Sequence, residues 1–208
     1  MWNAVAKALL VLLVALPAAG CASVDPVIKI GLVAPFEGRD RDVGYDAIYS
    51  ARMAVREINA AGGVAGHRVS LVALDDRGDP ELARQAAASL AIDPGVIAVV
   101  GHYLPESTAA AEAIYRENGV PLLPLGRPPF APFDPLVLPA EFREAYAAVT
   151  PFDEIAGPFA GPTYDAIGLL REALAEAEET TGTITRASVQ DALGGLKYQG
   201  VTGEVYLP

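Results

Sequence analysis

The stretch RVSLVALDDRGDPELARQAAASLAI, residues 68–92, holds a strand, a turn and a helix in direct succession. Residues 68–76 are largely apolar, which is typical of a buried strand. Asp79 is a good N-cap and Pro80 suits the first helical position, so the spacing predicts a helix over 79–92. This unit indicates an α/β protein.

Similar units lie on both sides of this stretch. Continuous apolar runs predict strands at 27–33, 96–101 and 120–125, and apolar residues at helical spacing predict helices over 42–60 and 106–118. Three strand–helix units followed by a short fourth strand predict half of a doubly wound parallel sheet.

Residues 126–140, GRPPFAPFDPLVLPA, interrupt this regular pattern. Proline fixes φ and donates no backbone hydrogen bond, so this proline-rich stretch is neither a helix nor a central strand. Either two modules meet here or a segment that normally occupies this place is missing. Beyond it, the pattern predicts helices over 140–149, 163–179 and 185–193, the last capped by Thr185, and a strand over 201–207.

The N-terminus has the features of an export signal. Lys7 precedes the apolar run 8–16, and the small residues of PAAGC, 17–21, follow it. This ending resembles a bacterial lipobox, which implies that residues 1–20 are a signal peptide, that Cys21 is lipidated and that 21–26 form a tether. The alternative is an ordinary signal peptide with a cysteine near the cleavage point. The lipobox reading predicts an exported membrane lipoprotein on the periplasmic or extracellular face.

The charge balance excludes some partners. The chain of 208 residues has a formal net charge of −11, from 15 Lys and Arg against 26 Asp and Glu. Nucleic acid and anionic bilayer surfaces both require a basic face, so neither is expected as the main partner. With a single cysteine, the chain cannot form an internal disulfide, and its stability must come from packing.

Several segments in the correct order resemble one known family. They are IKIGLVAPFEG (28–38), AVREINAAGGVAGHRVSLVALDDRGDPELA (54–83), VIAVVGHYLPESTAAAEAIYRENGVPLL (96–123), PTYDAIGLLREAL (162–174) and YQGVTGEVYL (198–207). Together they resemble the first lobe of the type I periplasmic binding proteins, in the branched-chain amino acid class that serves ABC importers. The resemblance implies the α/β fold of a single lobe over 27–208.

Members of that family have two lobes joined by three crossing segments, with the ligand held between the lobes. In this sequence the first departure to the second lobe is replaced by the proline-rich residues 126–139. We therefore expect an extended connector in place of the second lobe. The alternative is a degenerate gene product that does not fold.

Ligands of open parallel sheets sit at the carboxyl ends of the strands, which here precede the loops 34–40, 75–80, 101–107 and 124–129. The candidate ligand residues at this cleft edge are Phe36, Glu37, Tyr103, Glu106, Ser107, Thr108 and Arg127. The resemblance implies hydroxyl side chains that hold a ligand carboxylate, but Pro105 and Pro128 stand at two of those places. Glu106 also opposes a carboxylate, although its main role is expected to be favourable interaction with the helix dipole. We therefore expect weak or no binding of free leucine, isoleucine or valine.

Other chemistry has little support in the sequence. DDRGDP (75–80) groups three carboxylates, but Asp79 is used as a cap, so we expect a solvated turn and no metal. His67 and His102 are each expected at the surface or bonded to backbone. No nucleophile–base pair and no cofactor motif is recognisable, so the chain is not expected to be an enzyme.

Two functions remain open. The first is a lipid-anchored, solute-binding-like protein with a reduced or altered site for a small polar, amino acid-like solute, acting with an ABC permease or another membrane protein. The second is an interaction lobe that docks a transporter, a sensor or a second copy of itself through the former cleft face. Tyr103, Phe130 and Phe133 are expected to make that face apolar.

Overall fold

The computed structural model describes residues 25–207. The predicted signal peptide, Cys21 and most of the tether lie outside the described residues. In chain order the elements are β1 (Val27–Ala34), α2 (Arg41–Ala60), β2 (Arg68–Asp75), α3 (Pro80–Ala91), β3 (Val96–Gly101), α4 (Pro105–Glu117), β4 (Leu122–Leu123), the 3-10 helix η1 (Pro135–Val137), α5 (Ala140–Val149), α6 (Ala160–Thr181), α7 (Arg186–Leu193), β5 (Lys197–Gly200) and β6 (Gly203–Tyr206).

The main sheet has the strand order β2-β1-β3-β4, and its neighbouring strands are all parallel. The predicted α/β class and parallel sheet are confirmed. The register pairs Ala34 of β1 with Asp75 of β2, and Val33 with Gly101 of β3. The carboxyl ends of these strands therefore meet at one edge of the sheet.

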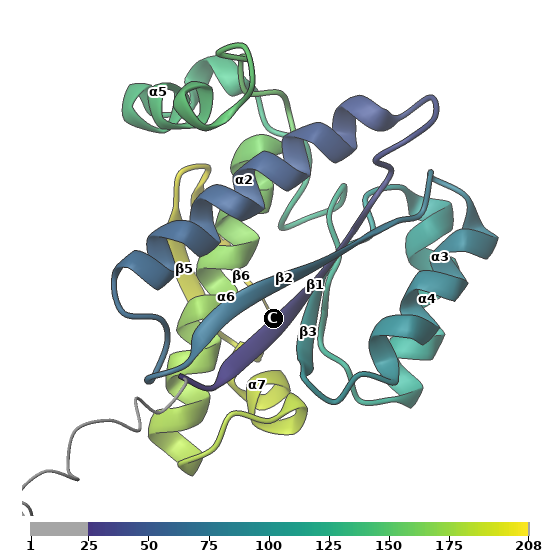
Figure 1. The fold of residues 1–208 in the computed structure, drawn as a ribbon, viewed down its shortest axis with the longest axis vertical. Coiled ribbons are helices and arrows are strands. Elements are labelled where there is room, and N and C mark those ends of the chain that lie inside the picture. The colour runs from purple at the N-terminus through teal and green to yellow at the C-terminus, as the bar shows by residue number, and fades with distance from the viewer. Residues whose placement is uncertain (1–24, 208) are drawn as a thin grey trace, which may run out of the picture.

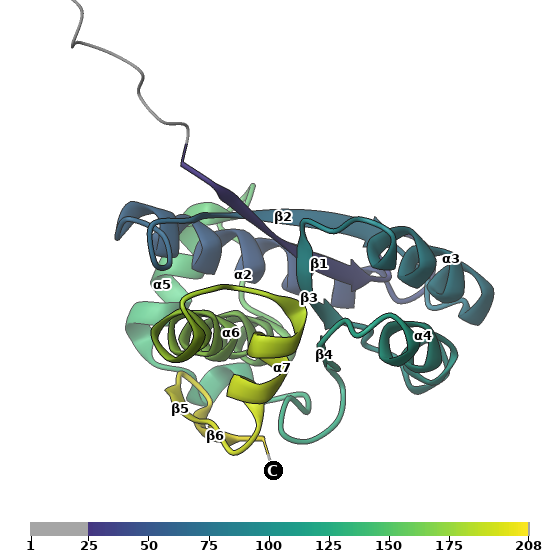
Figure 2. The ribbon, with the colours of Figure 1, turned by 90° about the horizontal axis from the view of Figure 1, so that it is seen from below.

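Helices cover both faces of this sheet (Figure 2). Ile30 and Leu32 of β1 point to the face covered by α2 and α6, whereas Val33 points to the face covered by α3 and α4. Gly31 points to that second face too, where an added Cβ would lie 2.8 Å from Leu90 of α3. Burial of each large apolar side chain contributes about 1.5–3 kcal/mol, so this double covering explains the continuous apolar strands.

The predicted helix caps are present. The side chain of Asp79 accepts hydrogen bonds from the backbone N–H groups of Glu81 and Leu82, at 2.8 and 3.0 Å. Thr185 and Ser188 form a reciprocal capping box at the start of α7. Helix α6 starts three residues earlier than predicted and includes Pro162, which is tolerated in the first turn because backbone N–H groups there have no partner within the helix.

The strand predicted over 201–207 is present as β6. It pairs with β5, which the sequence pattern did not indicate, in an antiparallel hairpin separate from the main sheet. The carboxylate of Asp165 in α6 accepts hydrogen bonds from the backbone N–H groups of Val201 and Thr202, at 2.8 and 2.9 Å. A tertiary contact thus holds the hairpin turn.

The proline-rich residues 126–139 lie against the lobe and include the 3-10 helix η1. Phe130 is buried, and its carbonyl accepts a hydrogen bond from the backbone N–H of Gly126 at 2.9 Å. The N–H of Phe133 donates to the carbonyl of Pro158, which ties the stretch to the segment before α6. Figure 1 shows α5, which follows this stretch, packed beside α2 at the end of the lobe. No helix within residues 25–207 is long and apolar enough to cross a membrane.

Candidate functional site

The loops that follow β1 to β4 are joined to one another at the carboxyl edge of the sheet. The N–H of Phe36, after β1, donates to the carboxylate of Asp75 at the end of β2, at 2.8 Å. The N–H of Leu125, after β4, donates to the carbonyl of His102, after β3, at 3.1 Å. This edge is where open α/β sheets bind ligands.

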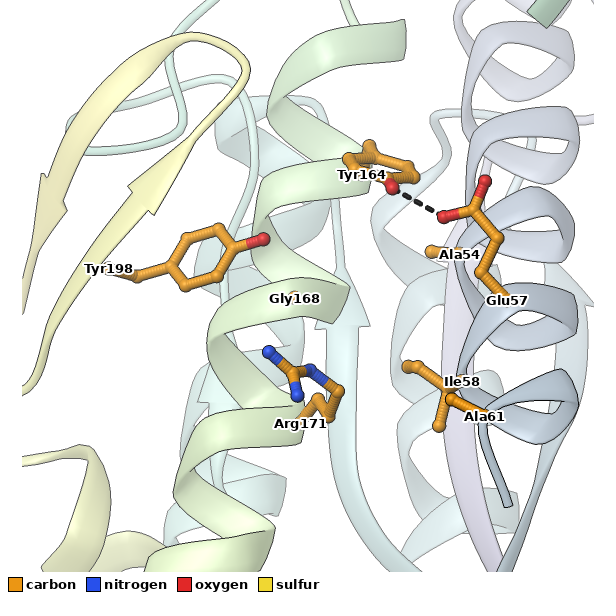
Figure 3. Close-up of a pocket in the computed structure, with 8 residues that line it drawn as sticks. All are labelled: Ala54, Glu57, Ile58, Ala61, Tyr164, Gly168, Arg171 and Tyr198. Atoms are coloured by element: carbon orange, nitrogen blue, oxygen red, sulfur yellow. Dashed lines mark hydrogen bonds between the residues drawn. The ribbon is translucent and has the colours of Figure 1, made fainter. Parts of the chain in front are cut away.

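A hollow lies between α2 and α6, and Figure 3 shows the side chains that line it. Its volume is about 260 Å³, and it is lined by residues of α2, α6 and β5, including Ile58 and Ala61 near the end of α2. Tyr164 donates a hydrogen bond to Glu57 across it. Because α2 begins at the carboxyl edge and runs back across the sheet, its last turn lies toward the opposite edge.

Phe36 and Glu37 belong to the β1–β2 side of the edge. The guanidinium of Arg77 pairs with Glu37 and also lies 3.4 Å from Asp75. More than half of the Arg77 and Glu37 side chains is exposed, so this pair contributes at most about 1 kcal/mol. Neither Phe36 nor Glu37 lines the pocket that is described below.

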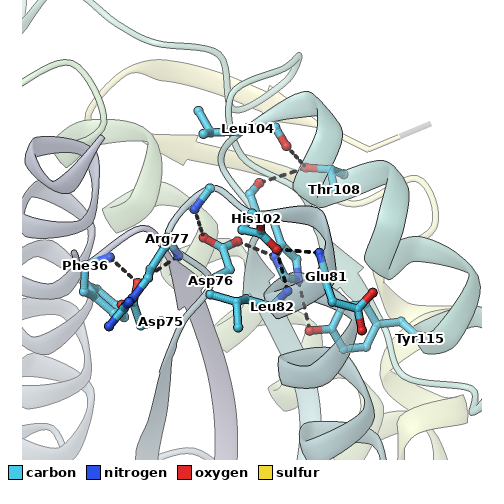
Figure 4. Close-up of polar contacts among 12 residues, drawn as sticks. Phe36, Asp75, Asp76, Arg77, Glu81, Leu82, His102, Leu104, Thr108 and Tyr115 are labelled. Carbon is cyan, nitrogen blue, oxygen red and sulfur yellow. Dashed lines mark hydrogen bonds and ion pairs between the residues drawn. The ribbon is translucent and has the colours of Figure 1, made fainter. Parts of the chain in front are cut away.

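A buried polar chain lies beneath the loop after β3 (Figure 4). Nδ1 of His102 lies 2.6 Å from Oδ2 of Asp76, and both side chains are buried. Nε2 of His102 lies 3.3 Å from the hydroxyl of Tyr115 in α4. The expectation that His102 is at the surface or bonded to backbone was therefore wrong. His67 is partly exposed and contacts the carbonyl of Ala65, as expected.

The sequence did not predict these hydrogen bonds of His102, because Asp76 and Tyr115 lie 26 and 13 residues away from it and only the fold brings the three side chains together. Asp75 and Asp76 do point to different partners, as expected for adjacent residues of a strand end. The carboxylate of Asp76 also accepts from the N–H of Gly78, at 2.9 Å. Within residues 25–207 no group of His, Cys, Asp and Glu side chains is arranged to hold a metal ion.

The hydroxyl group of Tyr103 points into the lobe. Its hydroxyl lies 2.9 Å from Oγ1 of Thr163 in α6, and its ring packs edge-on against Phe159. Burial raises the pKa of the Tyr103 phenol, so it stays a neutral hydrogen-bonding group. Phe130 is buried too, which corrects the expectation that Tyr103 and Phe130 form an exposed apolar patch.

The first turn of α4 holds three further candidates. Oγ1 of Thr108 lies 3.0 Å from the carbonyl of Leu104 and 3.2 Å from that of His102. Ser107 is buried, and its hydroxyl has no hydrogen-bond partner among the described residues. Glu106 is exposed. The hydroxyl groups of this turn therefore face the protein interior.

Three of the seven candidate residues line one small pocket beside this turn. The pocket has a volume of about 140 Å³ and is lined by Tyr103, Pro105, Thr108, Ala109, Leu125, Gly126 and Arg127. The guanidinium of Arg127 pairs with Glu112 of α4, and both side chains are about half exposed. The roles of Ala109 and Leu125 were missed because small apolar side chains carry no chemical signature in the sequence.

A parallel sheet covered by helices, with a pocket at its carboxyl edge, is the architecture of a small-molecule-binding α/β lobe. The chain belongs to the periplasmic binding protein family, whose model matches residues 27–139. This is a family of binding proteins, not of enzymes, and membership implies export.

Curated relatives are similar to the first part of the chain. An amino acid binding protein of Pseudomonas aeruginosa is 37% identical over 93 residues, 45% of this chain and 25% of the relative. A Leu/Ile/Val-binding protein of Escherichia coli K12 is 34% identical over 118 residues, 57% of this chain and 32% of the relative. The matches thus span about a quarter to a third of these relatives.

Solved structures share the fold. The branched-chain amino acid transporter substrate binding protein LivJ from Streptococcus pneumoniae, solved with isoleucine, matches with a TM-score of 0.73 at 17% identity. The match covers 88% of this chain and 92% of that chain. The described lobe therefore has the type I periplasmic binding protein fold, related to the binding proteins of amino-acid ABC importers.

Proposed function

We propose that this protein is a lipid-anchored, solute-binding-like protein with a ligand site altered from that of its branched-chain amino acid relatives. The observation that carries this proposal is the orientation of the hydroxyl groups at the carboxyl edge. Those of Tyr103 and Thr108 bond to protein atoms, and that of Ser107 is buried. None of the three is presented to a solute at this edge.

A ligand carboxylate therefore meets few donors on this lobe. Pro105 occupies the first position of α4 and has no backbone N–H, and exposed Glu106 follows it. A hydrogen bond to a charged group contributes about 1.5–3 kcal/mol, so three missing bonds weaken a micromolar site beyond the millimolar range.

The domain organisation is part of the same proposal. Residues 1–20 are proposed as a signal peptide, Cys21 as the lipidated residue and 21–26 as a tether, with 27–208 acting as one lobe. The hydrogen bond between Phe133 and Pro158 supports a role for 126–139 as the direct connection between the two halves of that lobe. The expected partner is an ABC permease or another membrane protein.

Calorimetry with the full chain tests the altered site. We expect leucine, isoleucine and valine to show no binding in the micromolar range, and a micromolar dissociation constant for any of them would contradict the proposal. Cell fractionation tests the anchor, because Cys21→Ala is expected to move the protein from the membrane fraction to the soluble fraction.

A second candidate function is docking to another protein. Phe152 and Ile155 are 93% and 83% exposed, and Leu136 and Val137 are 74% and 65% exposed. These residues flank α5, and large exposed apolar side chains favour a protein contact. Sedimentation of the wild type and of a Phe152→Ser, Ile155→Ser variant tests docking to a second copy of this chain. Self-association that the double variant loses supports docking to a second copy, and a wild type that stays monomeric at high concentration contradicts it.

A further inference from the structure

We infer that the pocket beside Arg127 binds a small monocarboxylate that has an apolar tail and no amino group. This inference rests on the proposed function, because it assigns a ligand class to the altered site.

Only one of the described polar side chains that line the pocket has hydrogen-bond donors free to bind a charged ligand atom. The hydroxyl of Thr108 and the N–H of Leu125 already donate to backbone carbonyls, and the N–H of Gly126 donates to Phe130. Arg127 differs from these groups. One of its nitrogens, Nη2, pairs with Glu112, and its other N–H groups have no partner among the described residues. A guanidinium with free donors binds a carboxylate well.

The rest of the lining is apolar. Pro105, Ala109 and Leu125 contribute aliphatic surface, and the buried ring of Tyr103 contributes an aromatic wall. The volume of about 140 Å³ is close to that of a cavity of about 150 Å³ that holds benzene in another protein. The pocket therefore suits a tail of about four to six carbon atoms.

An α-amino group has no counterpart in this pocket. Among the described residues that line it there is no carboxylate. Glu112 lies outside the lining and is paired with Arg127, and Glu106 is exposed on the first turn of α4. An ammonium group placed in the pocket loses its hydration without gaining an acceptor, which is unfavourable. The pocket is thus expected to discriminate against free amino acids.

Three ligands that differ by one group test this inference on the full chain by calorimetry. 4-Methylpentanoate is leucine without its amino group, and 4-methylpentanamide has the same tail but no charge. We expect 4-methylpentanoate to bind at least about tenfold more tightly than either leucine or the amide, a difference of about 1.4 kcal/mol.

Two variants locate the binding. Arg127→Gln is expected to weaken 4-methylpentanoate binding at least about tenfold, whereas Arg116→Gln, a matched change of an exposed arginine in α4 that does not line this pocket, leaves it unchanged. Ala109→Leu places a larger side chain at an exposed helical position of the lining and is expected to block binding without lowering the melting temperature.

The outcomes separate this inference from the proposed function. If none of the three compounds binds at millimolar concentration, the inference is wrong, but the proposal of an altered ligand site is not contradicted. If leucine binds at micromolar concentration, the altered site is wrong as well. Equal effects of Arg127→Gln and Arg116→Gln also overturn the inference, because the carboxylate is then held elsewhere.

Discussion

The carboxylate of Asp46 in α2 accepts a hydrogen bond of 3.2 Å from the backbone N–H of Phe159, which lies 113 residues later and caps α6. The same carboxylate accepts from the N–H of Gly157 at 3.1 Å. Burial raises the pKa of Asp46, with these hydrogen bonds acting in the opposite direction. One side chain thus holds the start of α6, after the proline-rich stretch, against a helix that precedes it.

Asp46→Ala is expected to lower the free energy of unfolding by about 2 kcal/mol or more, because part-buried backbone N–H groups then lose their acceptor at the start of α6. Urea denaturation measures the change. Asp42→Ala, an exposed carboxylate in the first turn of the same helix, serves as the control and is expected to cost less than about 1 kcal/mol. Equal losses in the two variants would show that Asp46 does not secure α6.

Asp165 makes the stability of the hairpin contact depend on pH. Burial raises its pKa above the ordinary value of 3.8, although hydrogen bonds from Thr202 and Val201 oppose this shift. Between 3.8 and the raised value, the folded protein binds the proton more tightly than the unfolded chain does. The free energy of unfolding therefore falls as the pH rises through this window.

Asp165→Asn removes this titration while keeping the size of the side chain. Urea denaturation from about pH 4 to about pH 7 is expected to show the wild type losing stability relative to the variant as the pH rises. Asp46 is present in both proteins, so its own titration cancels in the comparison. A constant difference across this range would contradict the assigned direction of the shift.

The first half of the lobe was predictable because its signals are local. The cap at Asp79 and the apolar runs of β1 and β3 each depend on residues close in the chain. The hairpin was not predictable in the same way, since its turn is held by Asp165, 36 residues before Val201.

The candidate site shows the same division. The edge of the sheet followed from the strand order, and three of the predicted residues do line one pocket there. The direction of Tyr103 depends on Thr163, 60 residues away, and the burial of His102 depends on Asp76. Sequence patterns locate such residues at an edge but do not say which way their side chains point.

The adjacent hydroxyls of α4 provide a matched pair of substitutions. Ser107→Ala removes a buried hydroxyl without a partner among the described residues and is expected to raise the free energy of unfolding by about 1 kcal/mol. Thr108→Val removes a hydroxyl that donates to a backbone carbonyl and is expected to lower it by a similar amount. Both changes are measured by urea denaturation. Destabilisation by Ser107→Ala would indicate a partner for its hydroxyl.

Limited proteolysis distinguishes the two irregular segments of the lobe. Phe152 is 93% exposed and lies in a run of exposed residues, 151–155, whereas Phe130 in the proline-rich stretch is 1% exposed. A protease needs a segment that is exposed or opens locally, so chymotrypsin is expected to cut first after Phe152. Mass spectrometry identifies the fragments, and Phe152→Ser is expected to abolish this first cut. A first cut after Phe130 would instead mean that the proline-rich stretch detaches from the lobe more readily than the segment that follows α5.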